Sequence, residues 1–198
     1  MLNLVTKEAP DFTAEAVMAD NEINSTFSLS SFKGSYVVLF FYPLDFTFVC
    51  PTEILAFNEK IEEFKSRNAE IIGISVDSVY THLAWKNTDV DAGGIGQIIF
   101  PLVSDINKEI AESYGVLQND GTALRGLFLI DRDGIVRHSL VNDPSFGRSV
   151  SETLRMLDAL RHFDEKGRLC PANWEKGKAD MEASKKSVVD YLSKFASK

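Results

Sequence analysis

The sequence predicts an α/β fold in which helices flank a central mixed β-sheet and a C-terminal arm follows. Three observations carry this prediction. Buried-strand runs alternate with helical patterns along the first half of the chain. Two apolar runs on either side of Asp131-Arg132-Asp133-Gly134 then predict an antiparallel hairpin. Beyond about residue 163 the chain becomes polar and turn-rich, which marks the start of the arm.

The first elements are a strand, a helix, a second strand and a second helix. The β-branched and aromatic run SYVVLFFYP at 35–43 is typical of a strand buried on both faces. Apolar residues then recur at spacings of four and three from Cys50 to Phe64, which predicts one amphipathic helix. The run AEIIGISVD at 69–77 predicts another buried strand, and 78–87 has a helical pattern.

The second half supplies a short strand, two helices and the hairpin. Residues 98–105 predict a strand crossed by Pro101, and a helix is expected near 107–114. The hairpin covers 123–141. Ser149 and Glu152 have the spacing of a capping box, which predicts a helix that starts there.

We therefore expect a domain over residues 1–163 and an arm over residues 164–198. The arm is too short to bury a core of its own, so it is expected to pack on this subunit or on another. It ends in a charged helical segment at about 181–195 and carries Cys170.

Composition narrows the possible partners and the compartment. The chain has 198 residues and a formal net charge of −8, which argues against a nucleic acid or an anionic membrane as partner. The N-terminus lacks the pattern of a signal peptide, and the longest apolar run is too short to span a bilayer. We expect a soluble cytoplasmic protein, in which a cysteine pair is more often redox-active than structural.

Cys50 is the residue whose surroundings predict chemistry. It lies at the start of the predicted helix beside Pro51, where unpaired N–H groups and the helix dipole favour thiolate over thiol. Thr47, three residues earlier, is expected on the same face. Arg125 lies in an apolar strand and needs a partner, for which Glu53 is suited. The pattern alone does not decide whether Thr47 or Cys50 caps the helix, or whether Cys50 is an inert core residue.

The segment FFYPLDFTFVCPTEI resembles the peroxidatic-cysteine segment of the typical two-cysteine peroxiredoxins, the group of thioredoxin peroxidases and the bacterial alkyl hydroperoxide reductase C subunit. The resemblance covers nearly the whole chain. Further matching segments fall in the expected order: APDF (9–12), GISVDS (73–78), HLAWKN (82–87), ALRGLFLID (123–131), GRSVSETLRMLDAL (147–160) and CPANW (170–174).

This resemblance implies a thioredoxin-like fold and a thiol-dependent peroxidase for hydrogen peroxide and alkyl hydroperoxides. It implies that Cys50 is the peroxidatic cysteine and that Cys170 of the partner subunit is the resolving one, in a homodimer that commonly assembles as a pentamer of dimers. The reductant would be thioredoxin or a flavoprotein disulfide reductase, and no metal, haem or flavin is required. The remaining site residues implied are Pro43, Thr47 and Arg125, supported by Glu53 and Arg148.

Two other function classes remain open from the residues alone. A cysteine hydrolase or thioesterase would need a histidine base near Cys50, and the three histidines, His82, His138 and His162, are interpreted as surface or packing residues. A chaperone-like ring could coexist with peroxidase activity. The loop at 93–96 resembles the glycine-rich element of overoxidation-prone peroxiredoxins, but Tyr191-Leu192 replaces their Tyr-Phe, which leaves that sensitivity open.

Overall fold

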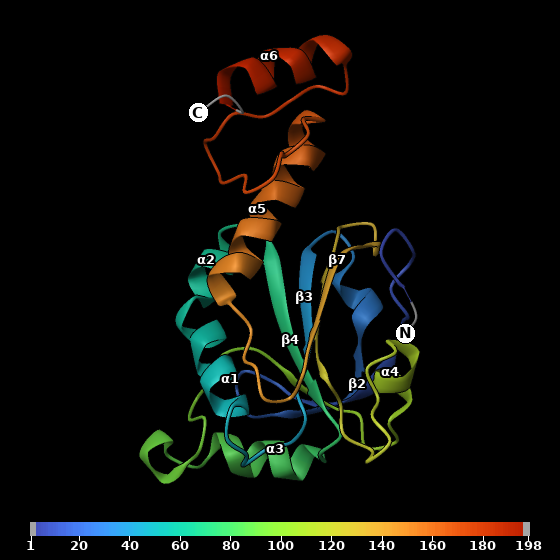
Figure 1. The fold of residues 1–198 in the computed structure, drawn as a ribbon. Helices are drawn as coiled ribbons and strands as arrows, with labels where there is room; N and C mark the ends of the chain where they lie inside the picture. Colours follow the sequence, from blue (N-terminus) through green and yellow to red (C-terminus); the bar gives the residue numbers. More distant parts are fainter. Residues whose placement is uncertain (1–2, 196–198) are drawn as a thin grey trace. The chain divides into compact units, whose positions relative to one another are not determined.

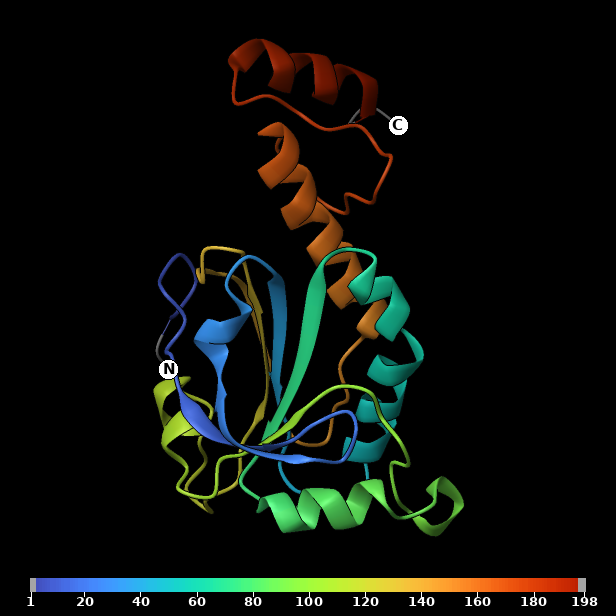
Figure 2. The same ribbon diagram turned by 180° about the vertical axis from the view of Figure 1, so that it is seen from behind.

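The computed structural model describes residues 3–195, whose ribbon Figures 1 and 2 show from opposite sides. The chain divides into two compact units, Met1–Val150 and Ser151–Lys198. The strands are β1 Thr13–Val17, β2 Ile23–Ser28, β3 Tyr36–Phe41, β4 Ala69–Ser75, β5 Leu102–Ser104, β6 Arg125–Ile130 and β7 Val136–Asn142. The helices are α1 Cys50–Glu59, α2 Ile61–Lys65, α3 Val79–Lys86, α4 Glu109–Ser113, α5 Val150–Lys166 and α6 Lys185–Phe195, with 3-10 turns η1 Leu29–Phe32 and η2 Val90–Ala92.

The first unit is built on a single mixed sheet, which confirms the predicted fold class. Its seven strands lie in the order β2-β1-β5-β4-β3-β6-β7. The β3-β4 and β4-β5 pairs are parallel, whereas β1-β2, β1-β5, β3-β6 and β6-β7 are antiparallel. Helices α1 and α2 lie on one side of this sheet and α4 on the other, as both views show (Figures 1 and 2).

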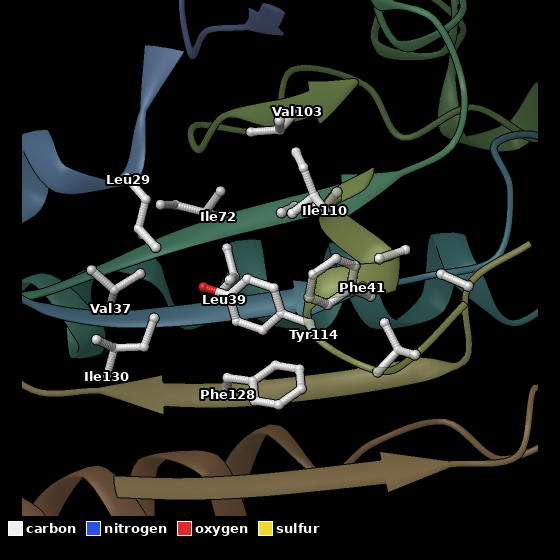
Figure 3. Close-up of a cluster of buried hydrophobic side chains, with 14 of the residues drawn as sticks. Leu29, Val37, Leu39, Phe41, Ile72, Val103, Ile110, Tyr114, Phe128 and Ile130 are labelled. Carbon is white, nitrogen blue, oxygen red and sulfur yellow. The ribbon is translucent and has the colours of Figure 1, made fainter. Parts of the chain in front are cut away.

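Strand β3 is buried on both faces, which explains why its sequence is continuously apolar. Val37, Leu39 and Phe41 belong to the core cluster that also contains Tyr114 and Phe128, and Figure 3 shows these side chains gathered from neighbouring elements. On the opposite face, aromatic side chains pack between the sheet and helices α1 and α2. Phe40 stacks on Phe57 at 4.8 Å, Phe57 contacts Phe64, and Phe100 meets Phe40 edge-on.

Three differences from the sequence prediction have physical reasons. The helix expected over Cys50 to Phe64 is divided at Lys60 into α1 and α2, although its apolar stripe stays buried through both. The strand expected over 98–105 begins only at Leu102, because Pro101 has no N–H to give to the sheet. Strands β1 and β2 were not predicted, since they are short and exposed residues interrupt their apolar pattern.

The second unit contains α5 and α6 and the segment between them. A bridge between Leu169 and Met181 closes this segment into a loop that carries Cys170. Trp174 is buried within the loop, packs on the His162 ring of α5 at 4.7 Å and thereby docks the segment on that helix. The boundary expected at 163/164 stays a prediction. No helix formed by residues 3–195 is long and apolar enough to cross a membrane.

Arg125 and the loop that leads to Cys50 lie at the same end of the central strands. Strands β3 and β4 run parallel and end there, at Phe41 and Ser75. Strand β6 runs antiparallel to β3, so its first residue, Arg125, lies where β3 ends. The loop 42–49 follows the end of β3 and leads directly into α1, whose first residue is Cys50.

Candidate functional site

Cys50 is the first residue of α1 and is fully buried, with 0% of its surface exposed. The N-cap is Val49, so both residues that the sequence left open as caps, Thr47 and Cys50, are wrong. No side chain caps the helix, and Pro51 in the first turn contributes no N–H. The sulfur is therefore beside the positive end of a helix whose first N–H groups are not neutralised by a capping side chain.

Thr47 meets the sulfur as expected. Its Oγ1 lies 2.9 Å from Cys50 Sγ and 2.7 Å from the Leu44 carbonyl oxygen. The Thr47 hydroxyl has one proton, and both the Cys50 sulfur and the Leu44 carbonyl oxygen lie within its reach as acceptors. This arrangement supplies a hydrogen-bond donor at the point where a thiolate would carry its charge.

Arg125 is buried in the first position of β6 and reaches the sulfur from the other side. Its Nη1 lies 3.5 Å from Cys50 Sγ and donates to Glu53 Oε2 at 2.6 Å, so the contact expected between Arg125 and Glu53 is present. Its Nε donates to the Pro144 carbonyl at 2.7 Å. The guanidinium is thus held in a fixed orientation, with one nitrogen shared between a carboxylate and the cysteine.

Arg148 completes the charge network around Glu53. Its Nε and Nη2 bind the Glu53 carboxylate at 2.7 and 2.9 Å, and its backbone N–H donates to the same group at 2.7 Å. Nη1 donates to the carbonyls of Phe41 and Gly126. Burial lowers the pKa of Arg148, and the hydrogen bonds to Glu53 oppose that shift.

Two guanidinium groups and one carboxylate leave one buried positive charge without a counter-charge beside the sulfur. The Arg125 guanidinium lies 3.5 Å from the Cys50 sulfur, where it can stabilise negative charge that develops on a bound substrate. Glu53 anchors both arginines and offsets the repulsion between them.

The loop before Cys50 has an unusual backbone. Pro43 is half-buried at its start, and Phe46 adopts φ 53°, a left-handed conformation that non-glycine residues seldom take. The Phe46 and Phe48 side chains are exposed, Phe48 to 92%. Neither of these two aromatic residues therefore belongs to the core of the first unit.

Sequence reasoning missed a group of buried polar residues beneath the same loop. Asp45 and His82 are in contact in the interior, together with Tyr42, Ser75 and Asp77. Asp45 stands between leucine and phenylalanine in an otherwise apolar run. The reasoning that singled out Arg125, a charge in an apolar context, would have found it.

Cys170 lies in the second unit and has different surroundings. It is half-buried, and its sulfur donates to the Ala159 carbonyl of α5 at 3.6 Å. Burial and the nearby Asp180 carboxylate raise the pKa of the Cys170 thiol, and Arg155 opposes them. Within residues 3–195, no group of three or more His, Cys, Asp or Glu side chains is arranged to hold a metal ion.

Comparison with protein-family models gives two matches that together cover most of the chain. Residues 5–139 match the AhpC/TSA family. Residues 159–194 match the C-terminal domain of 1-Cys peroxiredoxin. The first match contains Cys50 and every other residue of its charge network except Arg148, and the second contains Cys170.

The similar proteins carry peroxiredoxin names. The chain is 52% identical over 190 residues to alkyl hydroperoxide reductase C of Helicobacter pylori, covering 96% of each chain. It is 52% identical over 193 residues to the chloroplastic 2-Cys peroxiredoxin BAS1 of Hordeum vulgare, covering 96% of this chain and 91% of that protein. The crystal structure of the reduced 2-Cys peroxiredoxin of Plasmodium vivax superimposes with a TM-score of 0.95 and 52% identity, covering 97% and 100% of the two chains.

That superposition confirms the thioredoxin-like fold expected from the resemblance. The identities and coverages place the similarity over the whole chain rather than over the cysteine segment alone. The chain belongs to the AhpC/TSA family and is a peroxiredoxin, a thiol-dependent peroxidase of the typical two-cysteine group.

Proposed function

We propose that Cys50 is the peroxidatic cysteine, which reduces hydrogen peroxide and alkyl hydroperoxides. One observation carries the assignment: the buried Cys50 sulfur has the Thr47 hydroxyl at 2.9 Å and the Arg125 guanidinium at 3.5 Å. These are two donors of different kinds at one nucleophile, the arrangement needed to bind a peroxide and stabilise the charge that develops on its oxygens. A hydrolase would need a histidine at the sulfur, and the hydrogen bonds of this sulfur are to Thr47 and Arg125.

The reaction conserves atoms and electrons without a cofactor. The thiolate attacks one peroxide oxygen, the O–O bond breaks, and the sulfur loses two electrons to become a sulfenate. The other oxygen leaves as water or an alcohol after it accepts a proton. Arg125 and Thr47 stabilise the transferred and departing oxygens, Pro43 limits access of bulk water, and Glu53 and Arg148 fix the position of Arg125.

Cys170 of a partner subunit is then the resolving cysteine. Its thiolate attacks the sulfur of the Cys50 sulfenic acid, an S–S bond forms as the S–O bond breaks, and the departing hydroxide accepts a proton and leaves as water. An external dithiol protein, thioredoxin or a flavoprotein disulfide reductase, returns both cysteines to thiols by exchange. The half-buried position of Cys170 on a polar loop supports this role, because the attacking sulfur must leave the Ala159 carbonyl to reach its target.

Disulfide formation requires the first turn around Cys50 to unwind, since the sulfur is fully buried while it lies in α1. Pro51 lowers the cost, because it has no N–H hydrogen bond to lose. Hydrogen exchange of residues 47–53 should therefore be faster in the disulfide form than in the reduced form. Equal protection in both forms would contradict this step.

We further propose a cytoplasmic homodimer that assembles into a pentamer of dimers. Strand β7 is an edge of the sheet, and an edge strand has backbone groups available to pair with a second copy. Exposed aromatic residues of the cysteine loop and of α3, Phe48 at 92% and Tyr80 at 75%, are suited to a further subunit contact. The mass of the reduced protein in solution tests both assemblies.

A non-reducing gel tests the two cysteine roles together. Reduced wild type, Cys50→Ser and Cys170→Ser each receive one equivalent of hydrogen peroxide. Wild type alone should become a disulfide-linked dimer, whereas Cys170→Ser should consume one equivalent and stop at the sulfenic acid. Peroxide consumption by Cys50→Ser at the wild-type rate would refute the assignment.

A further inference from the structure

Asp45 and His82 form a fully buried pair beneath the loop that precedes Cys50. Both side chains have 0% exposed surface, and His82 Nδ1 lies 2.7 Å from Asp45 Oδ2. The second ring nitrogen, Nε2, lies 3.2 Å from the Val103 carbonyl oxygen of β5. Neither residue has a part in the peroxide chemistry described above.

The partners of the ring fix its protons. A carbonyl oxygen only accepts, so His82 Nε2 carries a hydrogen and donates to Val103. One further proton must lie between Nδ1 and Asp45 Oδ2, as imidazolium facing carboxylate or as imidazole facing carboxylic acid. Burial raises the pKa of Asp45, and His82 opposes that shift. In either form the pair is neutral overall and both hydrogen bonds are made.

Asp45 is tied down at three points. Its Oδ1 accepts from the Tyr42 hydroxyl at 2.8 Å, and its Oδ2 faces His82. Its backbone N–H donates to Asp77 Oδ2 at 2.9 Å, and that carboxylate is fixed by the Ser75 hydroxyl at 2.6 Å. The loop is therefore anchored to the ends of β3 and β4 and, through His82, to α3.

The anchored residue lies two positions before Thr47. Between them Phe46 takes the left-handed φ of 53°, and its ring rests against Trp85 of α3 at 5.8 Å. A backbone held in a sparsely populated conformation persists only where surrounding contacts determine it. Two contacts of this kind come from α3, whose His82 bonds to Asp45 and whose Trp85 packs on Phe46.

We propose that Asp45 and His82 are positioning residues for peroxide reduction: the buried pair holds residues 43–47 in the conformation that presents the Thr47 hydroxyl to Cys50. This inference rests on the proposed role of Cys50. Loss of the pair leaves the thiol and both arginines in place but releases the hydroxyl from its position. Misplacing a catalytic group by about 1 Å can reduce a rate by about 100-fold.

The test compares Asp45→Ala with Asp45→Asn in a Cys170→Ser background, which isolates the first step. Asparagine keeps the shape, accepts from Tyr42 through its oxygen and donates through its amide to a neutral His82, so all the hydrogen bonds survive. Alanine removes the side-chain anchors. Asp120→Ala, an exposed aspartate of the same unit that bonds to Thr122, is the matched control.

Two rates are measured for each variant by the mass change at Cys50: oxidation by hydrogen peroxide and alkylation by iodoacetamide. Alkylation needs the thiolate but no orientation of a peroxide. For Asp45→Ala we expect oxidation to slow by about 10- to 100-fold while alkylation stays within about threefold of wild type or becomes faster. Asp45→Asn should oxidise within about threefold of wild type, and Asp120→Ala should match it.

Oxidation of Asp45→Ala at the wild-type rate would overturn the proposal, and so would an Asp45→Asn variant as slow as Asp45→Ala. If Asp45→Ala loses its near-ultraviolet circular dichroism, His82→Gln replaces it, since glutamine keeps only one of the two ring contacts and should slow oxidation selectively. Cys50→Ser, run alongside, tests the proposed function separately: peroxide consumption by that variant would refute the role of Cys50 whatever the Asp45 variants show.

Discussion

The two cysteines of this peroxiredoxin lie in regions that are built on different principles. Cys50 is fully buried at the start of a helix, and its neighbours are fixed by buried charges and hydrogen bonds drawn from β3, β6, α1 and α3. Cys170 is half-buried on a loop whose ion pairs, Arg168 with Asp180 and with Glu182, are partly open to solvent. The same chemical group is therefore preorganised in one place and loosely held in the other.

Under the roles proposed for the two cysteines, this difference matches what each reaction step requires. A sulfur that must activate a small peroxide benefits from donors that are already oriented and shielded from water. A sulfur that must move to its target benefits from contacts that cost little free energy to break. Exposed ion pairs are such contacts, because they contribute little to stability. The predictions below test this contrast, beginning with the largest expected effect.

Removing a carboxylate should have very different consequences in the two regions. Glu53→Gln leaves two buried guanidinium groups without a counter-charge, so we expect the free energy of unfolding to fall by about 3 to 5 kcal/mol. Asp180→Asn, at a pair that is partly exposed, should lower it by less than about 1 kcal/mol. Urea unfolding of the reduced proteins measures both. Equal decreases in the free energy of unfolding would show that burial does not determine how much these ion pairs stabilise the protein.

Replacing an arginine by lysine should also separate the regions. A lysine at position 125 cannot serve Glu53, Pro144 and the sulfur together, because it lacks the planar fork. We expect Arg125→Lys to slow Cys50 oxidation by about 100-fold. Arg155→Lys is the matched control, since Arg155 bonds to Glu152 and to the Trp174 carbonyl within the second unit. Arg155→Lys should keep the rate of Cys50 oxidation within about twofold of wild type. A decrease comparable to that of Arg125→Lys would show that the two regions are not independent in this step.

A third prediction concerns a buried cation whose hydrogen bonds go to carbonyls. Lys86 is fully buried, donates to the Met18 and Ala19 carbonyls, and has its pKa lowered by burial to about 8. The unfolded chain therefore binds more protons than the folded one above that pH, and stability should rise with pH until the ordinary lysine pKa. Relative to Lys86→Met, the gain should be at most about 1.4 kcal/mol per pH unit.

That slope is read from urea unfolding of wild type and Lys86→Met between pH 8 and pH 10. A difference between the two proteins that does not change with pH would mean that Lys86 stays protonated throughout. Lys86 bonds to carbonyls, whereas the arginines around Glu53 bond to a carboxylate. Comparing the two sites therefore separates the cost of burying a charge from the benefit of pairing it.

The smallest effect is expected at Cys170. Asp180 is one cause of the raised pKa of this thiol, so Asp180→Asn should lower that pKa and increase the thiolate fraction at neutral pH. Disulfide formation should become about twofold faster at pH 7, and its pH profile should move to lower pH. Glu182→Gln, which alters the other partner of Arg168, serves as control. Slower resolution at every pH would instead assign Asp180 a role in positioning the loop.

The sequence predicted the buried elements around Cys50 better than it predicted the first two strands of the sheet. The apolar run of β3 and the stripe of α1 leave clear periodic signals, and Arg125 was conspicuous in a buried strand. The contact between Arg125 and Glu53 follows from the need of a buried charge for a partner. By contrast, β1 and β2 are short and exposed residues interrupt their apolar pattern, so their sequence resembles that of a loop.

What the sequence could not supply was the geometry between distant segments. His82 was interpreted as a surface or packing residue, and only the fold brings it within 2.7 Å of Asp45, 37 positions earlier. The left-handed backbone conformation at Phe46 could not be predicted either, because the residue there is not a glycine. The roles of Pro43, Thr47, Arg125, Glu53, Arg148 and both cysteines stay predictions, and the experiments above test those of Arg125 and the two cysteines.

The two tryptophans of the chain give each region its own optical label. Trp85 lies against Phe46 of the cysteine loop, whereas Trp174 follows Cys170 by four positions and lies against His162. Indole fluorescence responds to the contacts of the ring. Trp85→Phe and Trp174→Phe would therefore leave emission from one region at a time, so that stopped-flow traces could assign each phase of the catalytic cycle to the loop that moves.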